Sequence, residues 1–281
     1  MNSTEISRDT PNRPDAGQGC DRALLLYAPG PEHVVTTNAW AFLHWLRVTG
    51  GPDLADWSAL QRFSAAEPVR FAALVSDFAQ LPAGPIRLAR HRGEREALVQ
   101  RHADGTRHAR TRHQLFAGNV AGLPPKIRAL LSRDWLAAEL VGPLAVLLLH
   151  ADLRPDDRLL VACAPVWPWL AALLAGTTVI LADPPPDTVL AVTAEEHATV
   201  LVTPAAVLER AISVCRHDRR PYANVRSIIA TGGPPPPETV SRISAVVGPD
   251  LMVLARSDDT LWGSPLDPVF ASPRATPALL G

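Results

Sequence analysis

Hydrophobic positions in the first third of the chain recur at helical spacing. Apolar residues three or four positions apart follow Asn38, Asp56 and Glu67, and Asn and Asp are residue types that cap helices. Ser64 to Glu67 has the spacing of a capping box, in which a hydroxyl and a carboxylate satisfy free N–H groups at a helix start. The pattern predicts three short helices that bury Trp and Phe side chains together, at Ala39–Leu46, Trp57–Phe63 and Val69–Phe78.

From Leu136 onward, short apolar runs alternate with segments of helical periodicity, beginning with a helix from Leu136 to His150. The runs are rich in Val, Ile and Leu, as expected for strands that are buried on both faces. This alternation is typical of an α/β protein with a mostly parallel sheet covered by helices. The predicted strands are Arg158–Ala162, Thr177–Leu181, Thr199–Val202, Ser227–Ala230 and Leu251–Leu254.

The segment from Arg87 to His113 is strongly basic, with eight arginines and four histidines. Ala97–Val99 and the turn at Asp104–Gly105 indicate a strand, a turn and a second strand, so a solvated hairpin at a sheet edge explains the charge. A phosphate- or nucleic-acid-binding patch is the alternative, but no aromatic residue is interleaved for base stacking. The histidines are His91, His102, His108 and His113. They lack metal-type spacing, and the neighbouring arginines would repel a cation, so no metal site is predicted.

Composition narrows the possible functions. The chain has 281 residues and a formal net charge of −1, which gives no electrostatic case for binding nucleic acid. Its 27 basic side chains include one lysine, Lys126, so a reaction that needs lysine must use Lys126 or one from a partner. Three separated cysteines argue against a disulfide framework or a structural zinc site. The sequence shows neither a signal peptide nor a stretch that could span a bilayer, so a cytoplasmic protein without a membrane partner is expected.

The patterns divide the chain into three parts. Residues 1–33 are expected to form a mostly disordered or irregular tail, and residues 34–82 a helical N-terminal cap. Residues 83–281 are expected to form the α/β domain.

Short motifs follow one another in a fixed order along the α/β part. They are Leu153–Leu160 (LRPDDRLL), Ala175–Leu181 (AGTTVIL), Ala198–Pro204 (ATVLVTP), Val225–Pro234 (VRSIIATGGP) and Gly263–Val269 (GSPLDPV). With the N-terminal helical segment, this series resembles the N-terminal domain of the acyl-adenylate-forming ligases, the AMP-dependent synthetase superfamily. Within that group it is most similar to acetoacetyl-CoA synthetase and its relatives. The resemblance implies a shortened N-terminal domain of an acyl-CoA synthetase, with a small helical cap and no C-terminal lid domain.

The resemblance also implies a two-step chemistry, in which a carboxylate attacks the α-phosphate of ATP and coenzyme A then displaces AMP. The first step needs a hydroxyl-rich loop with a lysine for the β- and γ-phosphates, and an acidic residue for Mg²⁺. It also needs an aspartate for the ribose and a second lysine from a C-terminal domain. ATP or AMP, Mg²⁺ and CoA are therefore the cofactors expected if the activity of the family survives.

The phosphate loop expected from the resemblance matches residues 117–126 best. Gly122 fits, but Val120 and Ala121 stand where hydroxyls should bind phosphate. Pro125 occupies the lysine position and removes an N–H donor, and Lys126 comes one residue late. In a competing alignment, the strand pair around Asp104–Gly105 and the helix after Thr111 match the opening elements of the family. Residues 118–122 are then helical, and no phosphate loop exists.

The second motif expected from the resemblance falls on residues 257–261. Thr260 fits, but Leu261 replaces the acid that should bind Mg²⁺. Asp258 and Asp259 stand where glycines should admit the nucleotide, and their charges would repel the α-phosphate or else bind a cation. The turn that best keeps the nucleotide-facing glycines is Thr231-Gly232-Gly233.

These departures favour a truncated, degenerate acyl-CoA ligase homologue, a pseudoenzyme that does not complete adenylation alone and that binds an acyl, nucleotide or protein ligand. One alternative is an active ATP-dependent carboxylic acid–CoA ligase in which Lys126, Thr260, Asp258 and Asp259 substitute for the usual groups, with Lys126 and Thr260 as catalytic residues. Another is a non-catalytic scaffold or regulatory subunit that forms a homo-oligomer or binds a protein partner. The cofactor-binding residues that the resemblance implies are Gly122, Thr231, Gly232, Gly233, Ser257, Asp258 and Asp259.

Overall fold

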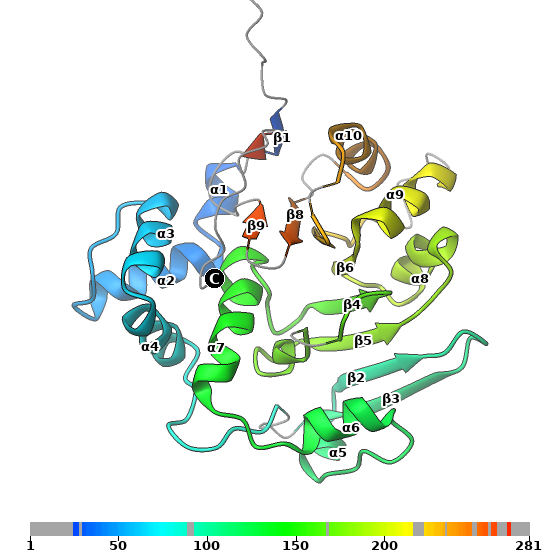
Figure 1. Ribbon diagram of the computed structural model, residues 1–281, viewed down its shortest axis with the longest axis horizontal. Helices are drawn as coiled ribbons and strands as arrows, with labels where there is room; N and C mark the ends of the chain where they lie inside the picture. The colour runs from blue at the N-terminus through cyan, green and yellow to red at the C-terminus, as the bar shows by residue number, and fades with distance from the viewer. Residues whose placement is uncertain are drawn as a thin grey trace, which may run out of the picture.

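The computed structural model of the chain is built on an eight-stranded sheet (Figure 1), with strand order β3-β2-β5-β4-β6-β7-β8-β9. The structure describes residues 25–27, 30–88, 93–166, 169–215, 222–233, 235–248, 252–257, 260–262 and 269–270. The strands are β2 (Glu96–Arg101), β3 (Arg107–Thr111), β4 (Arg158–Ala162), β5 (Thr178–Ala182), β6 (Val200–Pro204), β7 (Ser227–Thr231), β8 (Met252–Ser257) and β9 (Thr260–Trp262).

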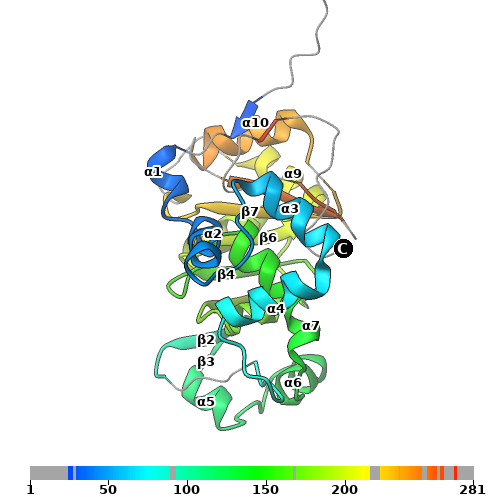
Figure 2. The ribbon, with the colours of Figure 1, turned by 90° about the vertical axis from the view of Figure 1, so that its left-hand side faces the viewer.

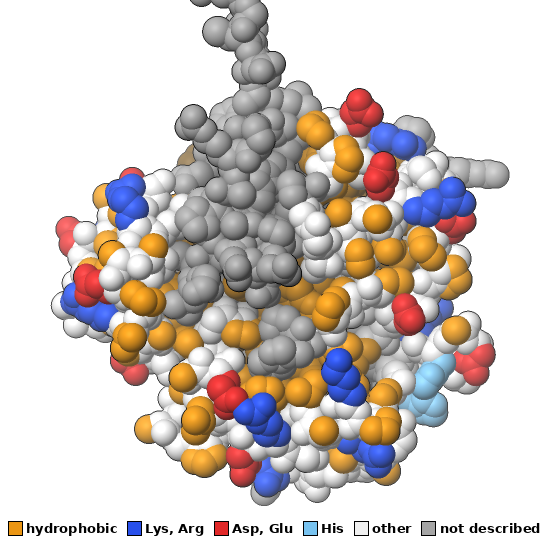
Figure 3. Space-filling view, viewed as in Figure 1, with side chains coloured by type: hydrophobic (Ala, Val, Ile, Leu, Met, Phe, Trp, Pro, Cys, Tyr) orange, Lys and Arg blue, Asp and Glu red, His pale blue; other side chains and the backbone are white. Residues whose placement is uncertain are grey.

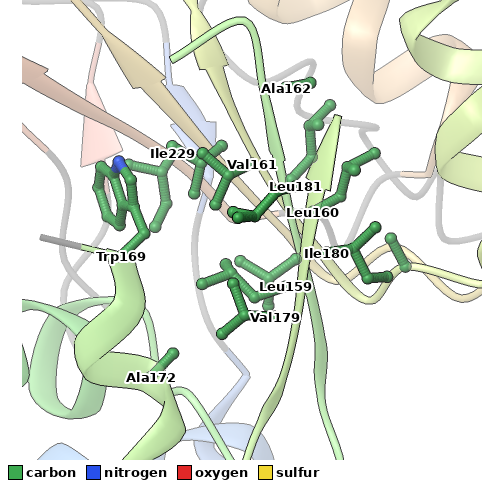
Figure 4. Close-up of a cluster of buried hydrophobic side chains, with 14 of the residues drawn as sticks. Leu159, Leu160, Val161, Ala162, Trp169, Ala172, Val179, Ile180, Leu181 and Ile229 are labelled. Atoms are coloured by element: carbon green, nitrogen blue, oxygen red, sulfur yellow. The ribbon is translucent and has the colours of Figure 1, made fainter. Parts of the chain in front are cut away.

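Six of these strands, from β2 through β8 in the sheet, run parallel, and β3 and β9 are antiparallel strands at the two edges. The parallel pairs are in register, so alternate residues of neighbouring strands share one face. Leu159, Val161 and Val179 point to one face, and Leu160 and Ile180 point to the other (Figure 4). All five side chains are buried, which explains why these strands read as continuous apolar runs. The predicted α/β class with a mostly parallel sheet is confirmed.

Helices cover the sheet on both faces. Trp169 of the short 3₁₀ helix η2 (Trp169–Leu173) lies beside Val161 and Ile229, on the face that also carries α7 (Ala137–Ala145) (Figure 4). The opposite face carries α8 (Val189–Glu195), α9 (Ala205–Val214) and α10 (Pro237–Val246) (Figure 1). The shorter elements are α5 (Arg112–Phe116), α6 (Pro125–Ser132) and the 3₁₀ helix η3 (Pro186–Thr188). Within the described residues, no helix has both the length and the apolar character needed to cross a membrane.

Three N-terminal helices form a separate hydrophobic cluster: α2 (Asn38–Val48), α3 (Trp57–Ala66) and α4 (Pro68–Phe78) (Figure 2). Its centre is aromatic, with the Phe42 ring contacting Phe71 edge-on at a centroid distance of 6.1 Å. Val141 and Leu149 complete this cluster from α7 and the following π-helix η1 (Val146–His150). Leu140 and Leu147 of the same segment lie in the main core. One continuous helical segment therefore belongs to both cores.

Several helix boundaries differ from the sequence-based expectation. The side chain of Thr37 caps α2 by accepting from the Trp40 N–H at 3.2 Å, so the prediction that Asn38 is the cap is wrong. The predicted capping box is also wrong, because Ser64 lies inside α3 and its hydroxyl donates to the Gln61 carbonyl. Asp56 does cap α3, accepting from the Ala59 N–H at 2.7 Å.

Other elements also depart from the predicted boundaries. The expected helix from Leu136 to His150 is divided into α7 and η1, with Pro143 inside α7. A proline there removes one hydrogen bond and crowds the turn before it, whereas the π-helical turn lies after it. β1 (Leu25–Tyr27), which pairs with β10 (Val269–Phe270), and α1 (Pro31–Val34) begin within residues 1–33, where no regular element is expected.

Asn38 has a different role, which is to join the helical cap to the α/β domain. Its backbone N–H donates to Asp152 Oδ1 at 2.7 Å, and its side-chain amide donates to the Leu153 carbonyl at 2.8 Å. The second oxygen of Asp152 accepts from Arg154 Nη2 at 2.7 Å. The Asp152 side chain is 1% exposed and lies 3.6 Å from the guanidinium of Arg226. A buried carboxylate with these partners is stabilising only while all of them are in place.

Replacing this charge is expected to destabilise the whole chain. Asp152→Asn keeps the size of the side chain and tolerates the positive φ of 49° at this position, but leaves the Arg154 guanidinium without its anion and removes one of the two carboxylates near Arg226. We expect a loss of about 2–3 kcal/mol in the free energy of unfolding, measured by urea denaturation. Asp53→Asn is the matched control, because the Asp53 side chain is 88% exposed in its pair with Arg47. Equal unfolding midpoints for the two variants would contradict the assignment.

Candidate functional site

A pocket of about 610 Å³ lies where strands β2, β5 and β4 end. The three strands are parallel, so their carboxyl ends meet at the same edge of the sheet, the edge at which open α/β sheets bind ligands. The side chains at its wall that carry chemistry are those of Gln100, Arg101, His102, Lys126, Cys163 and Asp183. A smaller cavity of about 340 Å³ adjoins it and shares Arg101, His102 and Asp183.

The floor of the pocket is a row of in-register side chains on one face of the sheet. Gln100 is opposite Leu181, which is opposite Val161, and Ile127 of α6 closes the row from above the sheet. Val161, Leu181 and Ile127 are buried, so the floor is largely apolar. The side-chain oxygen of Gln100 is buried without a hydrogen-bond partner among the described residues. One acceptor beside this apolar floor is therefore unused in the structure.

Lys126 occupies the second position of α6, at the rim of this pocket. Leu123 and Ile127 on either side of it are buried, and this packing fixes the start of the helix and leaves Lys126 exposed. The preceding loop is held by Arg110, whose Nη2 donates to the Ala121 carbonyl at 2.8 Å. Among the described residues, no carboxylate is paired with the Lys126 ammonium. Its charge is available to a ligand.

Arg101 also lines the pocket, but carboxylates already neutralise its charge. Its guanidinium pairs with Glu195 and, at 3.4 Å, with Glu196. Glu196 is 4% exposed and also binds Arg107 and Arg158, at 3.2 and 3.3 Å. A buried carboxylate among three guanidinium groups forms a structural ion network, and Arg101 is one of its members.

The same network includes Glu96 at the start of β2. Hydrogen bonding to Arg107 holds the pKa of the Glu96 carboxyl below its usual value, with Arg158 adding to the effect. The Arg107 pKa is raised in turn, chiefly by its hydrogen bonds to Glu96. The expected basic hairpin is thus present as β2 and β3, but much of its charge is paired with carboxylates rather than open to a polyanion.

Cys163, directly after β4, is a thiol rather than a thiolate at neutral pH. Its Sγ donates to the Pro184 carbonyl at 3.2 Å. Burial raises the pKa of the Cys163 thiol to about 11, with Asp183 adding to the effect through a hydrogen bond and its negative charge. Cys163 therefore contributes a polar wall to the pocket and no nucleophile.

The residues implied by the resemblance fall into two separate groups in the structure. Lys126 lies at the pocket beside β2, and the loop containing Gly122 leads into α6. Thr231 ends β7, and Gly232 and Gly233 follow it. β7 is two strands from β4 in the sheet and hence about 10 Å away. Gly232 and Gly233 have φ values of 85° and 125°, conformations that require glycine.

The remaining implied residues are Ser257, Asp258, Asp259 and Thr260. Ser257 of β8 pairs with Thr260 of β9, next to β7 in the sheet. Asp258 and Asp259 lie outside the described residues. The described residues of both groups lie at the carboxyl edge of the sheet. Of these residues, Lys126 of the first group lines the pocket beside β2, β5 and β4. The binding roles of all these residues remain predictions.

Neither alignment of the phosphate loop describes the structure completely. The strand, turn and strand around Asp104–Gly105 are confirmed as β2 and β3, and Thr111 caps α5 with a capping box. Residues 118–122 are not helical, and Gly118 and Gly122 have φ values of 78° and 80°. The competing alignment is therefore right about the hairpin and wrong about the segment that follows it.

Sequence reasoning did not identify Gln100, His102, Cys163 and Asp183 as parts of one pocket. Each of them lies within two residues of the end of a strand, at Arg101, Ala162 or Ala182. The rule that ligands bind at the carboxyl ends of parallel strands would have found them, once β2 was assigned to the parallel part of the sheet.

The low reactivity of Cys163 can be tested directly. We expect its alkylation rate with iodoacetamide to rise about tenfold per pH unit up to pH 10 without levelling off, as followed by mass spectrometry of its peptide, because the pKa is about 11. Asp183→Asn removes one cause of the raised pKa and should accelerate the reaction at a given pH. Asp187→Asn, in the same loop but paired with Arg210, is the control and should leave the rate unchanged. A plateau below pH 9 in the unmodified chain would show that this environment is assigned wrongly.

Comparison with known proteins supports the fold. No protein-family model matches the sequence, and a search of curated proteins finds no match. The structure is similar to that of acetoacetyl-CoA synthetase from Streptomyces lividans, with a TM-score of 0.71 and 15% identity over 88% of this chain and 67% of that chain. At this identity the similarity shows the fold alone. The expected acyl-CoA synthetase fold is thereby confirmed.

Shorter matches are found to other ligases. They include a benzoate CoA ligase from Burkholderia xenovorans LB400, with a TM-score of 0.39 and 16% identity over 48% of this chain and 32% of that chain. A long-chain-fatty-acid-CoA ligase from Archaeoglobus fulgidus matches with a TM-score of 0.38 and 11% identity over 46% of this chain and 30% of that chain. At these scores neither match supports a conclusion about this chain.

Proposed function

We propose that this chain binds an acyl or nucleotide ligand in the pocket between β2, β5, β4 and α6, and that it does not complete acyl adenylation alone. The observation that carries the proposal is the position of Lys126, an unpaired cation at the rim of a cavity with an apolar floor. Such a cavity suits an anion that has an apolar body, because the charge stays at the rim while the body is buried.

The size of the pocket agrees with this class of ligand. Its volume of about 610 Å³ lies within the range of roughly 300–1,000 Å³ that is typical of small-molecule sites. Val161, Leu181 and Ile127 would contact the apolar or planar part of the ligand. Gln100 would donate or accept a hydrogen bond at the floor, where its side-chain oxygen is unused. Lys126 would bind the carboxylate or phosphate.

Adenylation requires more positive charge than this pocket offers. Attack on the α-phosphate needs cations that stabilise the developing charge, and Arg101 is already paired with Glu195 and Glu196. Bound Mg²⁺ would supply such charge, but it needs oxygen ligands, and among the described residues of the pocket wall only Asp183 carries a carboxylate. The described residues therefore fit an anionic ligand better than an ATP–Mg²⁺ complex, and no catalytic step is assigned to them.

Binding can be tested by calorimetric titration with AMP, ATP, CoA and short carboxylic acids. We expect at least one of these ligands to bind, and Lys126→Ala to weaken its binding about tenfold because the charge at the rim is lost. Arg128→Ala is the matched control, since it removes the same charge from the same helix at an exposed position outside the pocket. Equal affinities for the two variants would contradict the role of Lys126. No heat from any ligand would overturn the proposal and favour the scaffold alternative.

Catalysis is a separate prediction. We expect no ATP–pyrophosphate exchange above background with a panel of short acids, even at high protein concentration, because the described residues that line the pocket offer one unpaired cation. Exchange that disappears in Lys126→Ala would show that the chain is an active ligase with substituted residues. The binding titrations and the exchange assay can thus fail independently of each other.

A further inference from the structure

Two histidine rings are brought together on the β2–β3 hairpin. His102 follows the last residue of β2, and His108 of β3 is opposite Gln100. The hairpin returns the chain so closely that the His102 N–H donates to the Thr106 carbonyl at 2.9 Å. The ring centroids are 5.3 Å apart, and the ring planes are inclined at 84°. Figure 3 shows histidine side chains gathered at this side of the molecule, near the tip of the hairpin.

The ring nitrogens of this pair have no other use within the described part of the chain. Neither ring takes part in a hydrogen bond or a salt bridge there, whereas His113 lies 3.7 Å from Glu94 and His150 is buried against Trp57. His108 is exposed, and His102 is half-buried at the wall of the 610 Å³ pocket. Both imidazoles therefore keep a lone pair that can bind a cation when they are neutral.

The arginines next to these histidines in the sequence do not oppose a cation here. Arg101 and Arg107 are register partners, and residues adjacent along a strand point to opposite faces. On that opposite face both guanidinium groups are paired with carboxylates, above all with the buried Glu196. The alternation of the strands therefore removes the repulsion expected from Arg101 and Arg107, and the Arg110 guanidinium, on the face of His108, is held by the Ala109 and Ala121 carbonyls.

The turn contributes negative charge instead. The Asp104 carboxylate accepts from the backbone N–H of Thr106 at 2.9 Å and also binds its hydroxyl. A cation at the ring nitrogens of His102 would therefore experience attraction from this side.

We propose that His102 and His108 form a two-histidine site for a divalent transition-metal ion such as Zn²⁺. Two imidazole nitrogens bound to one Zn²⁺ at 2.0–2.1 Å, in tetrahedral geometry, place their ring centres roughly 5 Å apart, close to the spacing found here. Imidazole suits Zn²⁺, Cu²⁺ and Ni²⁺, while Mg²⁺ prefers oxygen ligands. Two coordination positions remain for water or for the anionic group of a ligand in the adjoining pocket.

Zn²⁺ titration of the full chain by calorimetry, in a non-chelating buffer and without added nucleotide, tests this site. We expect one site that is weakened at least tenfold in both His102→Ala and His108→Ala. His44→Ala is the control, because it removes an exposed imidazole from α2, and its affinity should equal that of the unmodified chain. The double variant should bind Zn²⁺ as weakly as the single variants, because the loss of either histidine already removes the two-histidine site.

The outcomes separate clearly. Absence of Zn²⁺ binding in the unmodified chain overturns the site, as does binding that survives both substitutions. Circular dichroism spectra that match the unmodified chain confirm that the variants are folded. An excess of Mg²⁺ should leave the Zn²⁺ isotherm unchanged, and competition by Mg²⁺ would point to carboxylate ligands instead. None of these results depends on whether the pocket binds an acyl or nucleotide ligand.

Discussion

Two buried carboxylates directly after η1 hold the parts of this fold together. Asp152 binds the start of α2, and Asp157 accepts from Thr199 Oγ1 at 2.7 Å and from Arg226 Nε at 3.0 Å. Arg226 also donates to the Asp152 carbonyl, so one guanidinium joins both acidic residues. The helical cap and the amino ends of β4, β6 and β7 are therefore fixed at one place. The paired charges lie at the amino edge of the sheet, while the pocket opens at the carboxyl edge.

The strands were predictable because a strand that is buried on both faces consists of a continuous run of apolar residues. Runs such as those around Leu160 and Ile180 contain few polar residues, and these side chains are buried because helices cover both faces of the sheet. The cap of α2 was not predictable, because Thr37 and Asn38 are both good capping residues. The choice is made by Asp152, which is 114 residues away in sequence and binds Asn38 instead. The capping propensities of Thr37 and Asn38 do not depend on a partner so distant in the sequence.

The site was predictable only in part, for a related reason. The resemblance pointed to the neighbourhood of Lys126, which does line the pocket, because that inference needed only the order of motifs. The histidine pair and the neutralised arginines depend instead on which residues face each other across β2 and β3. One shift in that register would exchange the faces of His108 and Arg107 and change the chemistry of the hairpin. Spacing along the chain does not show which register is formed.

The helical segment formed by α7 and η1 places Leu140 and Leu147 in one core and Val141 and Leu149 in the other. An apolar helix that is buried on two sides depends on both clusters for its packing. Opening of the cap would expose Val141 and Leu149, while Leu140 and Leu147 would keep their places in the main core. A substitution on this shared segment therefore has to satisfy the packing of two cores at once.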